Sequence, residues 1–311
     1  MSKISPHLRA VLQALFVTLL WSTSWVLIKF GLADIPPLLF AGLRYMLAFL
    51  VLVPFLWRKS DLAGGREGAG KFHIPASVRA LTRGDWERLI VLGVVYYALT
   101  QGAQFVALAY APAVSVTLIL SFTAVFVALL GIFTLGEKPN GGQWLGMILA
   151  LFGAMLYFYP FGLAQAQFIG IVVAVVCMLA NSASAILGRY VNRGGAIKPL
   201  TVTVISMGIG AFLLLAAGIY VDGMPALSWQ NWLLILWLAV VNTAVAFTLW
   251  NHTLRTLSAV ESTVINNTMT VQIAILALLF LGETINGREL LGLAAVVAGT
   301  LLVQVWGRRK P

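Results

Sequence analysis

Residues 136–146 read GEKPNGGQWLG, and residues 282–292 read GETINGRELLG. The two stretches carry the same residue at six of their eleven positions, and 146 positions separate them. The same spacing also aligns residues 113–128 with residues 259–274 without a gap. An internal repeat at a fixed spacing is the first feature to seek in a chain, because it determines the architecture. The alternative explanation is chance similarity between apolar segments.

Composition identifies the environment in which these repeats fold. The 311 residues are 60% hydrophobic and 10% charged, with a mean hydropathy of +0.95, whereas soluble proteins carry about 25% charged residues. A bilayer core of about 30 Å needs about 20 apolar residues per helix. Apolar runs separated by proline and polar residues predict an all-α polytopic membrane protein with ten transmembrane helices, at 8–31, 36–57, 86–108, 113–135, 143–160, 167–189, 199–220, 230–251, 258–281 and 288–306.

Five of these helices lie in residues 1–160 and five in residues 161–311. A weaker similarity at a spacing of 160 places Ser22 on Ser182, which extends the repeat to whole halves. Because five is an odd number, the second half must enter the membrane upside down relative to the first. The sequence therefore predicts two inverted five-helix repeats, a design of many secondary transporters.

The basic residues predict the orientation. Of the twenty Lys and Arg residues, seventeen lie in segments on the side of the N-terminus, Lys29 and Arg288 lie on the other side, and Arg44 lies within a helix. The positive-inside rule then places both termini in the cytoplasm. This rule also accounts for the net charge of +10, so the partners that we expect are the lipid bilayer and a small-molecule substrate, and no nucleic acid.

Three motifs together resemble a known family. They are WSTSW at 21–25, PPLLFAGLRY at 36–45, and the Gly-Glu loop between the fourth and fifth helices of the first half. This combination resembles the EamA-like branch of the drug/metabolite transporter superfamily over nearly the whole chain. The resemblance implies a ten-helix transporter of the inner membrane of a bacterium, with a substrate site between its halves. Within that branch, the aromatic-rich helices most resemble the aromatic amino acid exporters.

Polar side chains recur on one face of several predicted helices. Tyr97, Gln101 and Gln104, for example, are spaced at i, i+4 and i+7. Polar groups in hydrocarbon need partners or water, so such faces turn inward, and here they predict a midplane cavity lined by helices one, three, four, six, eight and nine. The predicted substrate-binding residues are Trp21, Ser22, Arg44, Tyr97, Gln101, Asn181, Asn242, Trp250 and Asn267.

Each of these residues also has a purely structural interpretation. Hydroxyl and amide groups can join helices by hydrogen bonds. Trp21, Tyr97 and Trp250 can be packing residues rather than walls for an aromatic substrate side chain. Arg44 either bonds to carbonyls and polar groups of the first helix or contacts a substrate carboxylate.

Helices five and ten share a different pattern. Glycines spaced by seven residues occur in both, Gly146 with Gly153 and Gly292 with Gly299. Small-residue stripes let helix backbones approach closely. We therefore expect these helices to pack at the periphery, against neighbours or in a homodimer, and to line no cavity.

The residue inventory narrows the chemistry. His7, His73 and His252 are scattered and Cys177 is single, so we expect neither an enzyme nor a metal site nor a cofactor. Without clustered basic residues for phosphates or a midplane carboxylate, the sequence favours a facilitator of neutral or zwitterionic metabolites. The family resemblance implies in addition an exporter, with amino acids, aromatic ones included, as substrates. The alternatives are a proton-coupled exporter of other small metabolites or drugs, with Glu261 or His252 as coupling group, and a non-transporting membrane scaffold or receptor.

Overall fold

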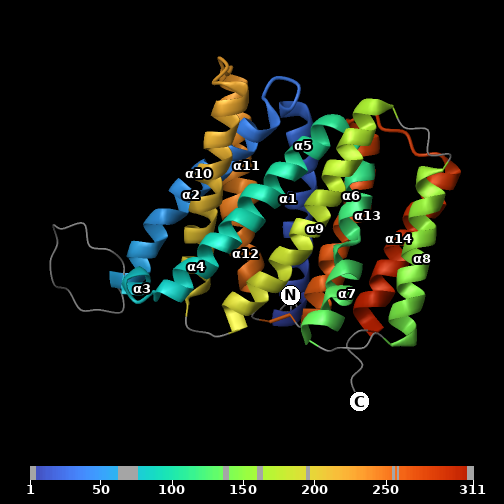
Figure 1. Ribbon diagram of the computed structural model, residues 1–311, viewed down its shortest axis with the longest axis horizontal. Coiled ribbons are helices and arrows are strands. Elements are labelled where there is room, and N and C mark those ends of the chain that lie inside the picture. Colours follow the sequence, from blue (N-terminus) through green and yellow to red (C-terminus); the bar gives the residue numbers. More distant parts are fainter. Residues whose placement is uncertain are drawn as a thin grey trace.

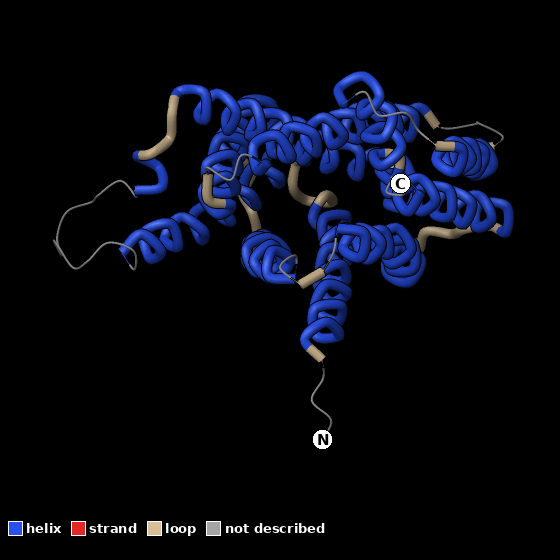
Figure 2. Tube along the Cα trace, turned by 90° about the horizontal axis from the view of Figure 1, so that it is seen from below, coloured by secondary structure: helices blue, strands red, loops and turns tan. Residues whose placement is uncertain are grey.

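The computed structural model describes residues 5–61, 76–135, 140–159, 164–193, 197–253, 256–257 and 259–306. All regular structure within these residues is helical (Figures 1 and 2). The first elements are α1 (Pro6–Gly31), α2 (Pro37–Asp61), α3 (Ala76–Arg79), α4 (Arg83–Leu92), η1 (Gly93–Gln101), α5 (Gly102–Tyr110), α6 (Ala113–Ser121), α7 (Thr123–Leu135) and α8 (Gly141–Phe158). The remaining elements are α9 (Gln165–Arg193), α10 (Pro199–Asp222), α11 (Trp229–Ala239), η2 (Val240–Val245), α12 (Ala246–Thr253), α13 (Ala259–Phe280) and α14 (Gly287–Trp306).

Each predicted transmembrane segment coincides with one helix or with a run of successive helices. Six helices in the described residues are long and apolar enough to cross a membrane, namely Pro6–Gly31, Pro37–Leu56, Arg83–Tyr110, Gly141–Phe158, Gln167–Gly188 and Pro199–Asp222. Shorter apolar helices span Ala113–Val127, Trp229–Val245 and Ile265–Phe280. The chain is therefore an all-α, multi-pass membrane protein.

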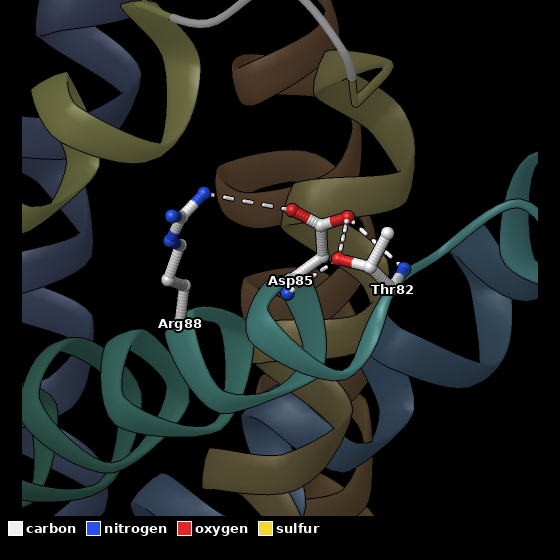
Figure 3. A network of polar contacts seen from close by, with 3 residues as sticks. All are labelled: Thr82, Asp85 and Arg88. Atoms are coloured by element: carbon white, nitrogen blue, oxygen red, sulfur yellow. Dashed lines mark hydrogen bonds and ion pairs between the residues drawn. The ribbon is translucent and has the colours of Figure 1, made fainter.

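Side chains fix where several of these helices begin. At the start of α4, the Thr82 hydroxyl accepts from the Asp85 backbone N–H at 3.3 Å, and the Asp85 carboxylate accepts from the Thr82 backbone N–H at 3.0 Å. Arg88, one turn later, lies 3.6 Å from the same carboxylate (Figure 3). This reciprocal capping box satisfies N–H groups that have no partner within the helix. The capping box therefore fixes the polar start of the long apolar helix Arg83–Tyr110.

The repeated loop motif starts α8 and α14 in the same way. Asn140 and Gln143 form a capping box with bonds of 3.0 and 2.9 Å, and Asn286 and Glu289 form its counterpart with two bonds of 2.9 Å. The side chain three residues after the asparagine closes each box. The shared Asn-Gly sequence is thus the shared start of two equivalent helices.

The glycines of α8 and α14 face one another. A Cβ atom added at Gly146 would lie 2.6 Å from the Gly299 carbonyl oxygen, and one added at Gly153 would lie 2.6 Å from the Gly292 carbonyl oxygen. The early glycine of one helix therefore meets the late glycine of the other, so the helices are antiparallel. The pair lies at one edge of the bundle, as predicted (Figure 1).

The remaining helices form a bundle with a recurring set of neighbours. α2 packs against α10, α1 against α13 and α12, and α9 against α5, α6 and α7. These contacts are symmetric when each predicted segment of the first half is exchanged for its counterpart in the second half. The contact of α1 with α13 then corresponds to that of α9 with α6 and α7. The contact of α1 with α12 corresponds to that of α9 with α5. The start of α1 and the end of α14 lie towards the same end of the bundle in Figure 1. We refer to the opposite end, where α1 ends and α6 and α14 begin, as the far end.

Candidate substrate site

Two π-helical segments interrupt long helices, η1 between α4 and α5 and η2 between α11 and α12. In each, a threonine hydroxyl donates to the carbonyl five positions earlier, Thr100 to Val95 at 2.8 Å and Thr243 to Leu238 at 2.9 Å. π turns are rare and are frequent at functional sites, because the extra residue changes which side chains share a face. The sequence predicted uninterrupted helices here, since an apolar run carries no signal for one inserted residue.

Arg44 of α2 is the buried charge of the site, with 5% of its surface exposed. Its Nε donates to the Thr243 hydroxyl of η2 at 3.1 Å. Its guanidinium carbon lies 5.4 Å from the ring centre of Tyr45 and 5.9 Å from that of Phe105, within the range of cation–π attraction. The two terminal amino groups of Arg44 donate no hydrogen bond to any residue that the structure describes. The guanidinium therefore keeps donors for a further partner.

Tyr45, which contacts this arginine, is the first of three tyrosines in ring contact. The Tyr45 hydroxyl donates to Gln101 Oε1 at 2.6 Å. The Tyr97 ring, 4% exposed, lies edge-to-face against Tyr45 at 5.7 Å and against Tyr96 at 4.8 Å between ring centres. We define the arginine cluster as Arg44, Tyr45, Tyr97, Gln101 and Thr243. Three of the predicted site residues, Arg44, Tyr97 and Gln101, thus belong to one connected group on α2, η1 and η2.

Asn242 lies next to the arginine cluster in the chain and is fully buried. Its amide nitrogen donates to the Leu20 carbonyl and lies 3.4 Å from the Thr23 hydroxyl, both on α1. Its Oδ1 atom has no hydrogen-bond partner among the described residues. An unmatched buried acceptor costs about 1–3 kcal/mol, and the large majority of buried polar groups in native proteins have a partner.

The predicted aromatic residues form a second group. Trp21 of α1 lies 5.2 Å from Trp250 and 5.3 Å from Phe247 of α12 between ring centres, with tilted ring planes. Both tryptophans are half-buried. This contact joins α1 to α12 and contains Phe247, which the sequence did not single out. Among the described residues, none of the ring contacts of Tyr97 is with this aromatic group.

Ser22 joins helices. It is fully buried, and its hydroxyl lies 2.8 Å from both the Thr18 carbonyl and Gln272 Oε1. The Gln272 amide nitrogen donates in turn to the hydroxyls of Thr18, at 3.2 Å, and Thr268, at 3.0 Å. The four side chains satisfy one another between α1 and α13. This placement matches the structural interpretation of Ser22.

The last two predicted site residues lie on other contacts. The Asn181 amide of α9 donates to the Thr123 hydroxyl of α7 at 3.3 Å, which is again a bond between helices. Asn267 is half-buried on α13. The structure thus places Arg44, Tyr97 and Gln101 in the arginine cluster and Trp21 and Trp250 in the aromatic group, while Ser22, Asn181 and Asn242 join helices.

Sequence reasoning missed Tyr45 and Gln272 as interacting residues. Tyr45 directly follows Arg44, but only the tertiary structure brings it to Gln101. Thr268 and Gln272 are spaced at i and i+4, a polar pair that indicates an inward face of α13. The internal repeat gives no support to this pair, because the 146-residue spacing aligns Gln272 with the apolar Phe126.

A cavity of about 430 Å³ lies at the far end. Ser115, Tyr157, Glu283 and Arg288 are among its lining residues, and they come from α6, α8, the α13–α14 loop and α14. None of the nine predicted site residues lines it. The prediction that helices five and ten line no cavity is therefore wrong for their ends, since Tyr157 ends α8 and Arg288 begins α14.

Known proteins resemble the chain over nearly its whole length. The pattern of the EamA-like transporter family matches residues 8–159 and 168–305. A protein named "Uncharacterized transporter YoaV" from Bacillus subtilis is 26% identical, over 97% of this chain and 99% of the relative. A "Probable amino-acid metabolite efflux pump" from Escherichia coli is 27% identical, over 95% of this chain and 94% of the relative. A crystal structure of another protein, 19% identical, shares the fold with a TM-score of 0.66 over 97% of this chain and 99% of that chain.

Proposed function

The chain belongs to the EamA-like transporter family and is a membrane transporter, and we propose that it exports zwitterionic small metabolites, amino acids with aromatic side chains among them. The similarity to a probable amino-acid metabolite efflux pump supports export and this substrate class. Two α-helical repeats with a site between them suit a small substrate better than a macromolecule.

The observation that carries the proposal is the guanidinium of Arg44, of which only the Nε atom donates a hydrogen bond within the described residues. A buried charge at membrane depth is costly unless it is compensated, and here one neutral hydroxyl, that of Thr243, accepts from it. A substrate carboxylate would supply both the missing charge and acceptors that match the planar guanidinium fork. The tyrosines beside it offer apolar ring surface to the rest of the substrate.

The second half of a zwitterion requires an acceptor. Asn242 Oδ1 is a buried acceptor to which the described residues offer no donor. Asn242 and Thr243 are neighbours in η2, so a rearrangement of this π-helix changes both together. We assign the substrate ammonium group to Asn242 Oδ1 and the carboxylate to Arg44. Trp21 and Trp250 are assigned to the walls of the passage for the substrate side chain.

We further propose that the helices are ten membrane spans in two inverted repeats, residues 1–160 and 161–311. The matching capping boxes of α8 and α14, their antiparallel glycine contact and the two π-helices all support this arrangement. The exchange symmetry of the helix contacts supports it independently. Inversion of one half about an axis in the membrane plane would place η1 and η2 at equal distances from the bilayer midplane.

The proposed orientation has both termini in the cytoplasm of a bacterium, with the protein in the inner membrane. The distribution of basic residues and the bacterial relatives support it. Homodimer formation through helices five and ten stays a prediction. Their glycines already contact each other within one chain, so a dimer would use the exposed faces of the pair, which include Ile148 and Leu291.

Transport by purified protein tests the function. The protein is reconstituted in liposomes, and uptake of radiolabelled phenylalanine, alanine and glucose 6-phosphate down their gradients is measured against protein-free liposomes. We expect saturable uptake of phenylalanine, weaker uptake of alanine, and no uptake of the sugar phosphate. A flat response to all three supports the scaffold or receptor alternative instead. Uptake that requires an imposed pH gradient supports the proton-coupled alternative.

A further inference from the structure

Three segments meet at the far end around one carboxylate. Glu283, in the loop between α13 and α14, accepts from the backbone N–H of Ala113 at 2.6 Å through Oε1 and from that of Val114 at 3.1 Å through Oε2. These are the first two residues of α6, whose N–H groups have no partner inside the helix. A carboxylate at this position also interacts favourably with the positive end of the helix dipole. Glu283 therefore caps a helix that is 170 positions away in the chain.

A cation holds the other side of the same turn. Lys29, near the end of α1, donates through Nζ to the carbonyls of Leu108 at 2.5 Å and Ala111 at 2.7 Å. Leu108 lies in the last turn of α5, so the charge of Lys29 faces the negative end of that helix. The turn between α5 and α6 is thus bound by a cation on its α5 side and by an anion on its α6 side.

The contacts of Lys29 lie within one half of the chain, whereas those of Glu283 connect the two halves. Lys29 and the α5–α6 turn both belong to residues 1–160, whereas Glu283 belongs to residues 161–311. The bonds of Glu283 to Ala113 and Val114 therefore tie the second half to the first at the far end. Alternating access requires one repeat or helix bundle to move against the other around the site, so some contacts between them must break at one end.

We propose that Glu283 is a latch of the transport cycle: its bonds to the start of α6 hold the far end closed, and their release opens the far end for substrate exit. Glu283 is then a positioning residue that controls which end is open. It rests on the proposed function, because a latch has a role only in a protein that transports. Lys29 keeps the α5–α6 turn in the shape that presents its N–H groups to Glu283.

The cavity at the far end makes this release feasible. Glu283 lines the cavity of about 430 Å³ together with Ser115, Gln167 and Arg288. Water in such a space can replace the N–H groups around the carboxylate when the contact breaks. The guanidinium carbon of Arg288 lies 5.6 Å from the centre of the Tyr159 ring, and its Nη2 atom lies 3.7 Å from Glu289 Oε1. A cation is therefore present among the residues that line the cavity with Glu283. The released carboxylate therefore has water and a cation near it instead of an apolar environment.

Glu289 provides a matched control. It lies six positions after Glu283, lines the same cavity, and also caps a helix start. Its bond runs to the Asn286 N–H at 2.9 Å, within its own helix end, and connects no halves. Glu283→Gln and Glu289→Gln each remove one negative charge from the same cavity. Only the first should alter opening of the far end.

The experiment measures opening directly, by access of a thiol reagent. Cys177 is replaced by serine, which keeps a donor for the Thr100 carbonyl, and Ser121, at the end of α6, is replaced by cysteine as a reporter. Intact cells are treated with a membrane-impermeant maleimide, and the labelling rate is compared among the parent, Glu283→Gln and Glu289→Gln. We expect labelling about tenfold faster in Glu283→Gln, because bonds to a charged acceptor are about twice as strong as neutral ones. Glu289→Gln should stay within about twofold of the parent. Equal rates in all three proteins overturn the latch.

A cross-link provides a second test that does not depend on the reporter. Pro112 and Thr284 line the cavity on opposite sides of the latch, one in each half, and both are replaced by cysteine. A cleavable bis-maleimide that joins them should stop transport, and cleavage should restore it. Transport at the parental rate while the cross-link is intact overturns the proposal. If the parent moves no amino acid, the proposed function fails, while the labelling rates still decide whether Glu283 closes the far end.

Discussion

The Nε atom of Arg44 donates a 3.1 Å hydrogen bond to the hydroxyl of Thr243, across 199 positions of the chain. The same hydroxyl donates to the Leu238 carbonyl at 2.9 Å within the π-helix η2. The buried charge of α2 is therefore connected directly to an irregular turn in the second half. On the proposed function, a substrate carboxylate that draws the guanidinium away from Thr243 would change one of the two hydrogen bonds that this hydroxyl makes.

Replacement of Arg44 tests the carboxylate contact. Arg44→Gln should weaken competition by tryptophan about 10- to 150-fold, because hydrogen bonds to charged groups contribute about 1.5–3 kcal/mol. Arg44→Lys should be intermediate, since it keeps the charge but loses the planar fork. Competition by tryptamine, which has no carboxylate, should change little. The measurement is inhibition of labelled phenylalanine uptake in liposomes, with Arg83→Gln at the exposed start of α4 as the control. Equal losses for tryptophan and tryptamine would assign Arg44 to packing alone.

Truncation of the aromatic residues tests selectivity. Trp21→Ala, Tyr97→Ala and Trp250→Ala should each weaken transport of aromatic amino acids more than that of alanine, because burial of a large side chain contributes about 1.5–3 kcal/mol. Trp21 and Trp250 are in ring contact at 5.2 Å, so their double variant should cost less than the sum of the single variants. Competitive uptake of phenylalanine and alanine provides the ratio. If all three variants keep the parental preference, these residues only pack the helices.

The glycine contact between α8 and α14 predicts a stability effect. Gly146→Ala places a methyl group 2.6 Å from the Gly299 carbonyl oxygen, so the helices must separate. We expect a loss of about 1–3 kcal/mol, as is usual for overpacking. Gly141→Ala, at the start of the same helix, has no atom within 4 Å of the added carbon and serves as the control. Thermal unfolding of the purified protein in detergent should show a lower midpoint for Gly146→Ala alone; equal midpoints would contradict the close packing.

Reporter fusions test the orientation. A tag after Pro311 and a tag within residues 58–85 should both be cytoplasmic, because seventeen of the twenty basic residues lie on that side. Protection of both tags from protease in intact cells, and their cleavage after permeabilisation, is the expected result. An external location for either tag contradicts the ten-span arrangement.

The helices were largely predictable because hydropathy and helix ends are local properties. The predicted segment 8–31 corresponds to α1 at Pro6–Gly31, and 258–281 to α13 at Ala259–Phe280. The end signals are in the sequence itself: Asn140 and Asn286 cap the helices that the repeated motif begins. The site was predictable only in part. Arg44, Tyr97 and Gln101 come together, whereas Ser22 and Asn181 bond between other helices.

The sequence by itself determined that this chain lies in a membrane, which segments are helical, and that two similar halves follow one another. Apolar composition and a 146-residue repeat suffice for these conclusions, because lipid leaves the backbone few alternatives. The tertiary structure alone decided the partners of the polar side chains, such as Thr243 for Arg44, Gln272 for Ser22 and Ala113 for Glu283. These pairs join residues that lie 170 to 250 positions apart, and a hydrogen bond depends on distances of a few tenths of an ångström. Helix periodicity shows that a side chain faces inward, but only packing determines which side chain it meets.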